Sequence, residues 1–228
     1  MKIHLLSCTP SPLDHIGRCA GYCWGAKVDS REKNVNRAKE CIKSGHGRVL
    51  EYVEVTAVIE DLSARAIREL YTHIAGTTRL QASTRYIDES GFEYFTPPSC
   101  NGLDEYKVAM DEVRKSYTDL VASGVPKEDA ANLLPIGMMS KMVWKVNLRS
   151  LVNFFQQRLC MRAYHEIREF AKAMKVKLRE IDPEWKWIAE SLFVPKCEIY
   201  KYRNPDICFC TEDKCCGRHK KLEDMRYK

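Results

Sequence analysis

The stretch from residue 68 to residue 86, RELYTHIAGTTRLQASTRY, gathers side chains that can hold an anion. It starts with a helical pattern that breaks at Gly76, and residues 76–82 have so little core-forming bulk that we expect a loop there. Hydroxyl groups donate to phosphate oxygens, and an arginine guanidinium can bind two such oxygens at once. The stretch therefore predicts an anion-binding loop, with a solvated connection as the alternative. The candidate anion ligands are Arg79, Ser83, Thr84 and Arg85.

Arg158 is a second residue that could carry chemistry. Helical spacing places it on the same face as Asn147, with apolar residues between them. A guanidinium that is buried without a partner costs free energy, so something anionic or rich in carbonyl groups should meet it. The alternative is a side chain that extends to solvent, or an ion pair with Glu166 or Glu169.

The C-terminal tail is the third cluster of reactive side chains. Cysteine and histidine supply the sulfur and nitrogen ligands that zinc prefers. However, the C-x-C and adjacent Cys-Cys spacings of this tail differ from two C-x-x-C knuckles, so we expect an extension without a metal, and zinc is the alternative. The zinc ligands in that alternative are Cys208, Cys210, Cys215, Cys216 and His219, with Cys197 as a further candidate.

Composition narrows the class of protein. The chain has 228 residues, of which 45% are hydrophobic and 30% charged, and its net charge is +6. This basic excess is spread along the chain, apart from residues 218–221 and 226–228, whereas a nucleic-acid binder concentrates it in a stripe. We therefore do not expect nucleic-acid binding. We also expect no membrane span, because no apolar run approaches about 18 residues. The odd count of 11 cysteines argues against a disulfide framework and predicts the reducing cytoplasm.

Hydrophobic periodicity predicts the elements that position these residues. The patterns indicate one α+β domain over residues 1–194 and a cysteine-rich extension over residues 195–228. Strands are expected at residues 2–8 and along the alternating segment around residues 53–60. Helices are expected within 11–25, over 31–44, after the N-cap Ser63, over 104–123, in a short segment between Pro126 and Pro135, and in one long run from about residue 148 to 181.

The stretch 68–86 also resembles the signature of the flavin-dependent thymidylate synthases, R-E-[LF]-x-R-H-R followed by [EQ]-x-S-x-R-Y. Thr72 and Ile74 replace the two arginines that usually flank the histidine, and the spacer is one residue longer. The matching residues are Arg68, Glu69, Leu70, His73, Gln81, Ser83, Arg85 and Tyr86.

Two further segments are similar to conserved blocks of the same family. VNLRSLVNFFQQR (residues 146–158) resembles N-x-R-[AS]-L-x-N-F-[FL]-x-x-R, and GHGRVLEY (residues 45–52) resembles G-H-x-T-P-F-E-H. The resemblance implies that Arg158 polarises the uracil ring of dUMP and is the catalytic residue. Implied FAD contacts are His46, Arg48, Glu51, His73, Gln81, Asn147, Arg149 and Asn153. Implied dUMP contacts are Glu69, Thr72, Arg79, Gln81, Ser83, Thr84, Arg85 and Arg158.

The resemblance covers about residues 19–168 and implies the fold and the reaction. The family fold is a central antiparallel sheet flanked by helices, assembled as a homotetramer whose active sites are shared between subunits. In the implied reaction NADPH reduces bound FAD, methylenetetrahydrofolate supplies one carbon, and dUMP becomes dTMP. No enzyme cysteine attacks the uracil in this family, so Cys23 and Cys160 are expected to be packing residues.

The departures from the family pattern keep other hypotheses open. Ala131 stands where the family has an arginine for the nucleotide phosphate, and Arg79 is the candidate replacement. Together with Thr72 and Ile74, this loss motivates an enzyme of the same scaffold that acts on a different pyrimidine nucleotide or one-carbon reaction. A zinc-tailed nucleic-acid-binding module, motivated by the terminal cysteines and the charge of +6, is the third hypothesis.

Overall fold

The structure is a computed structural model, and it describes residues 1–204 and 206–225. The chain divides into two compact units, each built from several segments. Unit 1 comprises Met1–His4, Val58–Thr72 and Arg79–Trp144, and unit 2 comprises Leu5–Ala57, His73–Thr78 and the described residues from Lys145 onward. The tail beyond residue 194 lies in unit 2, and its separation as an extension stays a prediction.

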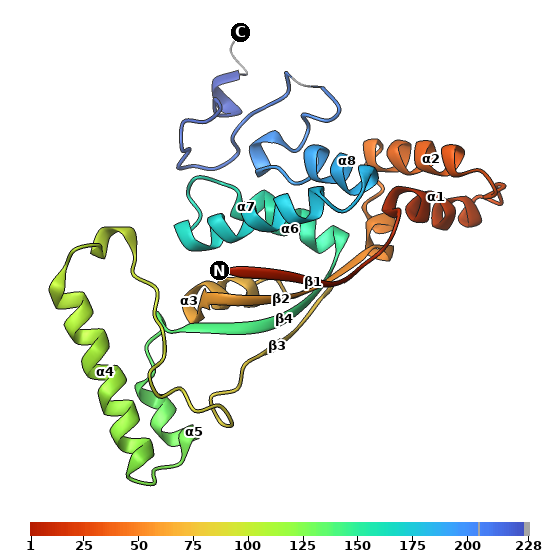
Figure 1. The fold of residues 1–228 in the computed structure, drawn as a ribbon. Helices are drawn as coiled ribbons and strands as arrows, with labels where there is room; N and C mark the ends of the chain where they lie inside the picture. The colour runs from red at the N-terminus through yellow and green to blue at the C-terminus, as the bar shows by residue number, and fades with distance from the viewer. Residues whose placement is uncertain (205, 226–228) are drawn as a thin grey trace. The chain divides into compact units, whose positions relative to one another are not determined.

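The fold is of the expected α+β class, with an antiparallel sheet flanked by helices (Figure 1). The sheet has the strand order β1-β2-β4-β3. In β2 the buried side chains alternate with more exposed ones, as the sequence predicted for a half-buried strand. The strands are β1 (Lys2–Cys8), β2 (Glu54–Ser63), β3 (Thr77–Gln81) and β4 (Met139–Asn147).

The loop that we expected over residues 76–82 is wrong, because most of it forms the edge strand β3. Backbone hydrogen bonds flank this strand on the side of β4: Asn147 N donates to Gly76 O at 2.9 Å, and Ala82 N donates to Lys141 O at 2.9 Å. An edge strand pairs with another strand on one side only, and its other side is open to solvent. It can therefore carry polar residues. The threonines that suggested a loop are β-branched and suit a strand.

Unit 1 contains helices that the sequence located well. The Ser63 hydroxyl accepts a hydrogen bond from Ala66 N at 3.1 Å, which confirms the expected N-cap. The longest helix of unit 1, α4, lies beside α5 and buries Met110 and Tyr117 (Figure 1). The helical elements of this unit are α3 (Ala64–Tyr71), η2 (Pro98–Cys100), α4 (Asp104–Ala122), α5 (Lys127–Ala130) and η3 (Ala131–Leu133).

Unit 2 contains the remaining helices, and one of the helices predicted from the sequence is wrong there. The long helix expected from about residue 148 to 181 is two helices, α6 and α7, with a turn between them. The Arg168 guanidinium donates to Met161 O at 2.6 Å and to Ala163 O at 3.1 Å, so a side chain satisfies the carbonyl groups of the turn. The helical elements are α1 (Pro12–Cys23), α2 (Arg31–Lys43), η1 (Gly47–Tyr52), α6 (Leu148–Arg158), α7 (His165–Arg179), α8 (Pro183–Ser191), η4 (Lys196–Glu198) and η5 (Glu223–Met225).

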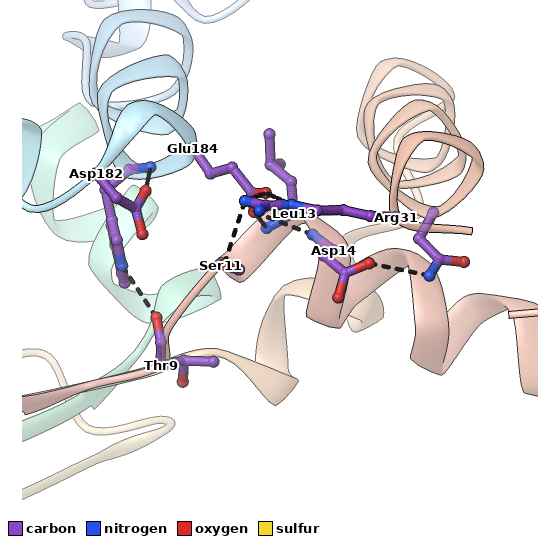
Figure 2. A network of polar contacts seen from close by, with 9 residues as sticks. Thr9, Ser11, Leu13, Asp14, Arg31, Asp182 and Glu184 are labelled. Atoms are coloured by element: carbon purple, nitrogen blue, oxygen red, sulfur yellow. Dashed lines mark hydrogen bonds and ion pairs between the residues drawn. The ribbon is translucent and has the colours of Figure 1, made fainter. Parts of the chain in front are cut away.

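A buried carboxylate joins three helices of unit 2 (Figure 2). Glu184, at the start of α8, is 7% exposed. Its carboxylate accepts hydrogen bonds from the backbone N–H groups of Leu13 at 2.8 Å and Asp14 at 3.1 Å, and from Arg31 at 2.8 Å. The N-cap residue of α1, Ser11, makes no side-chain cap, so Glu184 caps that helix from a distant part of the sequence.

No helix among the described residues is long and apolar enough to cross a membrane. Residues 226–228, which the sequence marked as a small basic cluster, lie outside the described residues.

Candidate functional site

The first turn of α6 is fitted closely against the chain before β3. Asn147 caps the helix, because its side-chain oxygen accepts a hydrogen bond from Ser150 N at 2.9 Å. Ser150 Oγ donates to Ala75 O at 2.5 Å. Gly76 has a φ angle of +63°, and a Cβ atom at this position would lie 2.3 Å from Asn147 Nδ2. Only glycine therefore lets the chain pass so close to the helix cap.

Arg158, in the last turn of α6, contacts His73. The Arg158 Nε–H group donates to His73 Nε2 at 3.1 Å. Because Nε2 accepts this bond, a neutral His73 carries its proton on Nδ1. The imidazole is 6% exposed and meets the ring of Phe154 edge-on, with 5.3 Å between ring centroids. Packing and one hydrogen bond thus hold the plane of the guanidinium.

The remaining polar residues of α6 lie beside η1. Arg149 forms an ion pair with Glu51, with 2.5 Å between Nη1 and Oε1. Leu148 N donates to Val53 O at 2.7 Å, which joins the start of α6 to the end of η1. Arg149 and Glu51 are both exposed, so a ligand could reach their charges. His46 and Arg48, from the same block of sequence, are exposed as well.

A cavity of about 440 Å³ lies in unit 2 at the end of α6. Its volume is in the range of ligand pockets, which run from about 300 to 1,000 Å³. Its wall combines predicted site residues with the C-terminal tail. The lining includes Asn153, Gln157, Arg158, Cys197, Cys215 and His219.

Unit 1 holds most of the predicted dUMP ligands. Arg79 donates to Leu70 O at 3.2 Å and lies over the Tyr71 ring, 4.3 Å from its centroid, so it covers the C-terminal end of α3. Thr72 Oγ1 donates to Glu69 O at 2.7 Å at the same helix end.

The second group of predicted dUMP ligands in unit 1 follows β3. Gln81 ends β3 and is exposed. Ser83 and Thr84 lie in the turn that follows, and Arg85 forms an exposed ion pair with Glu128 of α5 at 2.7 Å. A nucleotide phosphate would have to compete with the Glu128 carboxylate for this guanidinium.

The predicted site is therefore divided between the two units. The structure brings His73 to Arg158, and Glu51 to Arg149, in unit 2. The other predicted dUMP ligands all lie in unit 1, so their convergence with Arg158 stays a prediction; they are Glu69, Thr72, Arg79, Gln81, Ser83, Thr84 and Arg85.

Sequence reasoning missed two residues that contact predicted ligands. In unit 2, Ser150 contacts Asn147, and in unit 1, Glu128 contacts Arg85. The N-x-x-S spacing from Asn147 to Ser150 was a capping signal that could have found the first.

Comparison with known protein families shows which family the chain belongs to. Residues 4–184 match the family model described as thymidylate synthase complementing protein, Thy1. The chain belongs to this family, the flavin-dependent thymidylate synthases. It is therefore a member of an enzyme family, and the resemblance inferred from three blocks of sequence is confirmed.

Individual relatives support the same assignment over most of the chain. The flavin-dependent thymidylate synthase of Nitratidesulfovibrio vulgaris is 31% identical over 251 aligned positions, which cover 98% of this chain and 97% of that protein. The flavin-dependent thymidylate synthase of Geobacter sulfurreducens is 34% identical, covering 80% of this chain and 84% of that protein.

A solved structure shows the same fold. Thymidylate synthase X (ThyX) from Helicobacter pylori aligns with a TM-score of 0.69 over 85% of this chain and 99% of that one, at 18% identity. That crystal structure contains FAD and dUMP.

Proposed function

We propose that this chain binds FAD and catalyses the reductive methylation of dUMP to dTMP, with methylenetetrahydrofolate as the one-carbon donor and NADPH as the reductant. Family membership supports the reaction class. The observation that carries the proposal within this molecule is the contact of Arg158 with His73. Two residues that resemble family ligands of different molecules, the nucleotide and the flavin, are here hydrogen-bonded to each other.

The residues of unit 2 fit a flavin dinucleotide. The guanidinium groups of Arg48 and Arg149 are exposed and suit a pyrophosphate, because arginine binds phosphate oxygens in pairs. Gly76 keeps the first turn of α6 clear of side-chain bulk. The flavin supplies the redox chemistry of the reaction, and the protein binds and orients it. The residues that we assign to FAD are His46, Arg48, Glu51, His73, Gln81, Asn147, Arg149 and Asn153.

Arg158 supplies the electrostatic part of the chemistry. C5 of uracil becomes nucleophilic when negative charge develops on the ring, and a fixed guanidinium stabilises that charge. His73 accepts a hydrogen bond from Nε, and this contact orients the guanidinium group to which we assign the pyrimidine. A preorganised donor stabilises developing charge without having to reorient during the reaction.

Unit 1 supplies the phosphate ligands in this proposal. Ala131 offers no charge where the family pattern has an arginine, so Arg79, Arg85 and the hydroxyls of Ser83 and Thr84 bind the phosphate instead. Both guanidinium groups already have partners, and binding therefore requires an exchange of contacts. Arg79 and Arg85 are thus already paired, and Ala131 supplies no charge. These two observations favour a different pyrimidine nucleotide as the second candidate substrate.

We also propose that the protein is a homotetramer with shared active sites. Exposed apolar side chains support an interface in unit 1. Leu103 is 51% exposed and Val108 is 53% exposed, at and near the start of α4, and Ile136 is 56% exposed. Apolar side chains that remain exposed on a single chain can be covered in an assembly.

The visible spectrum of the purified protein tests the proposal first. We expect bound flavin that NADPH bleaches, and dTMP formation that depends on dUMP. A colourless protein that takes up neither FAD nor dUMP would rule the function out. Faster turnover of another pyrimidine nucleotide than of dUMP would instead favour the second candidate substrate.

The variant Arg158→Lys tests the catalytic residue. It keeps the charge but loses the planar fork, and we expect kcat to fall by about 10²- to 10³-fold, as for the loss of a preorganised donor. Arg179→Lys is the matched control, because Arg179 also ends a helix, α7, and forms an exposed ion pair with Glu190. Equal activity of the two variants would refute the role of Arg158.

A further inference from the structure

The C-terminal tail lacks the usual sources of stability. Among its described residues beyond Pro195, only Glu198 and Cys210 are buried, and neither is a large apolar side chain. Its regular structure within the described residues is limited to η4 and η5, two short 3-10 turns. Ordering each residue costs about 1–2 kcal/mol of backbone entropy, which apolar burial normally offsets. A segment with so little apolar burial requires another kind of cross-link to hold one conformation.

Ligand atoms of the kind that bind metal ions meet in this tail. Cys197, Glu198 and His219 each place one such atom within 4.8 Å of the others. Glu198, at 8% exposure, lies 3.2 Å from His219 Nε2. Two thiols lie nearby, because Cys210 and Cys215 line the same cavity as Cys197 and His219.

The backbone holds these groups together from separate parts of the tail. Phe209 N donates to Cys197 O at 3.1 Å, and Cys210 N donates to Lys220 O at 2.9 Å. Gly217 N points at Cys215 Sγ, at 3.3 Å. Donation from a backbone N–H group stabilises a thiolate.

We propose that Cys197, Cys210, Cys215 and His219 bind a zinc ion, with Glu198 as the carboxylate that orients His219. Three thiolates and one imidazole are a common structural zinc set, and a carboxylate that holds the ligating histidine is its usual second partner. The ion would supply the missing cross-link, because binding to a structural site stabilises the fold that forms it. This set differs from the one considered from sequence. Cys208 is not among the described residues that line the cavity, and Cys216 lines it but is exposed to solvent.

An arrangement without metal accounts for only part of these contacts. Arg218 Nε lies 2.7 Å from Glu198, so an ion-pair cluster would explain the buried carboxylate and the histidine. It would not explain why Cys197, Cys210 and Cys215 line the cavity beside them, together with Cys160 and Cys216.

Metal analysis of the reduced, full-length protein tests the site. We expect about one Zn²⁺ per chain to survive desalting, since structural sites of this type bind tightly. Replacement by Co²⁺ should give the sulfur-to-cobalt charge-transfer absorption of a tetrahedral thiolate site, and a chelator should increase the number of thiols that react with a thiol reagent. Absence of both stoichiometric metal and the cobalt–thiolate absorption in the wild-type protein would overturn the proposal, whatever the variants do.

Single variants then test the ligand set. We expect Cys215→Ser and His219→Ala to lose the cobalt–thiolate band or reduce its intensity strongly. Cys216→Ser is the matched control, because it removes an exposed thiol one position away and should retain both metal and spectrum. The assigned set is wrong if Cys216→Ser loses the metal while Cys215→Ser keeps it.

Discussion

The contact between Gly76 and the cap of α6 gives a prediction whose magnitude follows from the structure. Gly76→Ala adds one methyl group at a φ angle of +63°, next to Asn147. Two costs arise. A left-handed conformation costs a residue with a Cβ atom about 1–2 kcal/mol. The methyl would also lie 2.3 Å from Asn147 Nδ2, so the Asn147 side chain has to move away.

Moving Asn147 removes the N-cap of α6. Its side-chain oxygen accepts a hydrogen bond from Ser150 N, and loss of such a cap costs about 0.5–2 kcal/mol. The two costs together predict a loss of about 1.5–4 kcal/mol of unfolding free energy. For a chain of this length each kcal/mol shifts Tm by about 2–4 °C, so Tm should fall by roughly 3–16 °C.

Gly25→Ala is the matched control in thermal unfolding. Gly25 has a φ angle of +64°, but a Cβ atom there would meet nothing within 4 Å. It should therefore show only the conformational cost of about 1–2 kcal/mol. In an Asn147→Ala background the penalty of Gly76→Ala should become smaller, because the colliding amide is gone, but it should stay above that of Gly25→Ala, because Ser150 Oγ would still lie 2.6 Å from the added methyl group. Equal destabilisation by the two glycine variants in the wild-type background would refute the reasoning.

Two pairs of variants, one pair in each unit, test the contributions of carboxylates to stability. Glu184→Gln should cost about 2–3 kcal/mol, because hydrogen bonds to a buried carboxylate are lost. On the same helix, Glu190→Gln breaks an exposed ion pair worth about 0–1 kcal/mol, and similar Tm values for the two would contradict this. In unit 1 burial raises the pKa of Glu89 from its usual value of 4.5. The ionised carboxylate therefore destabilises the fold, and the free energy of unfolding falls as pH rises from 4.5 through the raised pKa. Glu89→Gln should therefore raise Tm at pH 7 but not at pH 4. Asp88→Asn should lower Tm at pH 7, because hydrogen bonds from Ser90 lower the pKa of Asp88 and stabilise its carboxylate; a gain in Tm for Asp88→Asn would contradict the assigned signs.

Local rules explain why several elements could be predicted from the sequence. The cap Ser63, the strand β2 and the helix α4 each carry their signal within a few residues, as a capping side chain or an apolar period. The strand β4 carried the same kind of signal, since Met142, Trp144 and Val146 are buried and alternate with other residues, but the pattern was not recognised. Its neighbour β3 could not be recognised by burial, because it is an edge strand whose residues are mostly exposed.

Contacts between distant residues explain what the sequence could not show. The turn between α6 and α7 contains neither glycine nor proline, and Arg168 from the next helix satisfies its carbonyl groups. The bond from Arg158 to His73 joins residues that are 85 positions apart. The motifs identified both residues as ligands, but only the fold shows that they contact each other.

The fold also gives a reason why His73 is kept while the arginines that usually flank it are absent. His73 is 6% exposed and contacts both Phe154 and Arg158, so its replacement would disturb the packing of unit 2. Ile74 is 75% exposed and Thr72 is exposed as well. Exposed positions tolerate substitution at little cost in stability. Changes at these two positions therefore alter what the chain offers to a ligand and leave the scaffold intact, which is why family membership is plain from the sequence while we propose a different mode of phosphate binding.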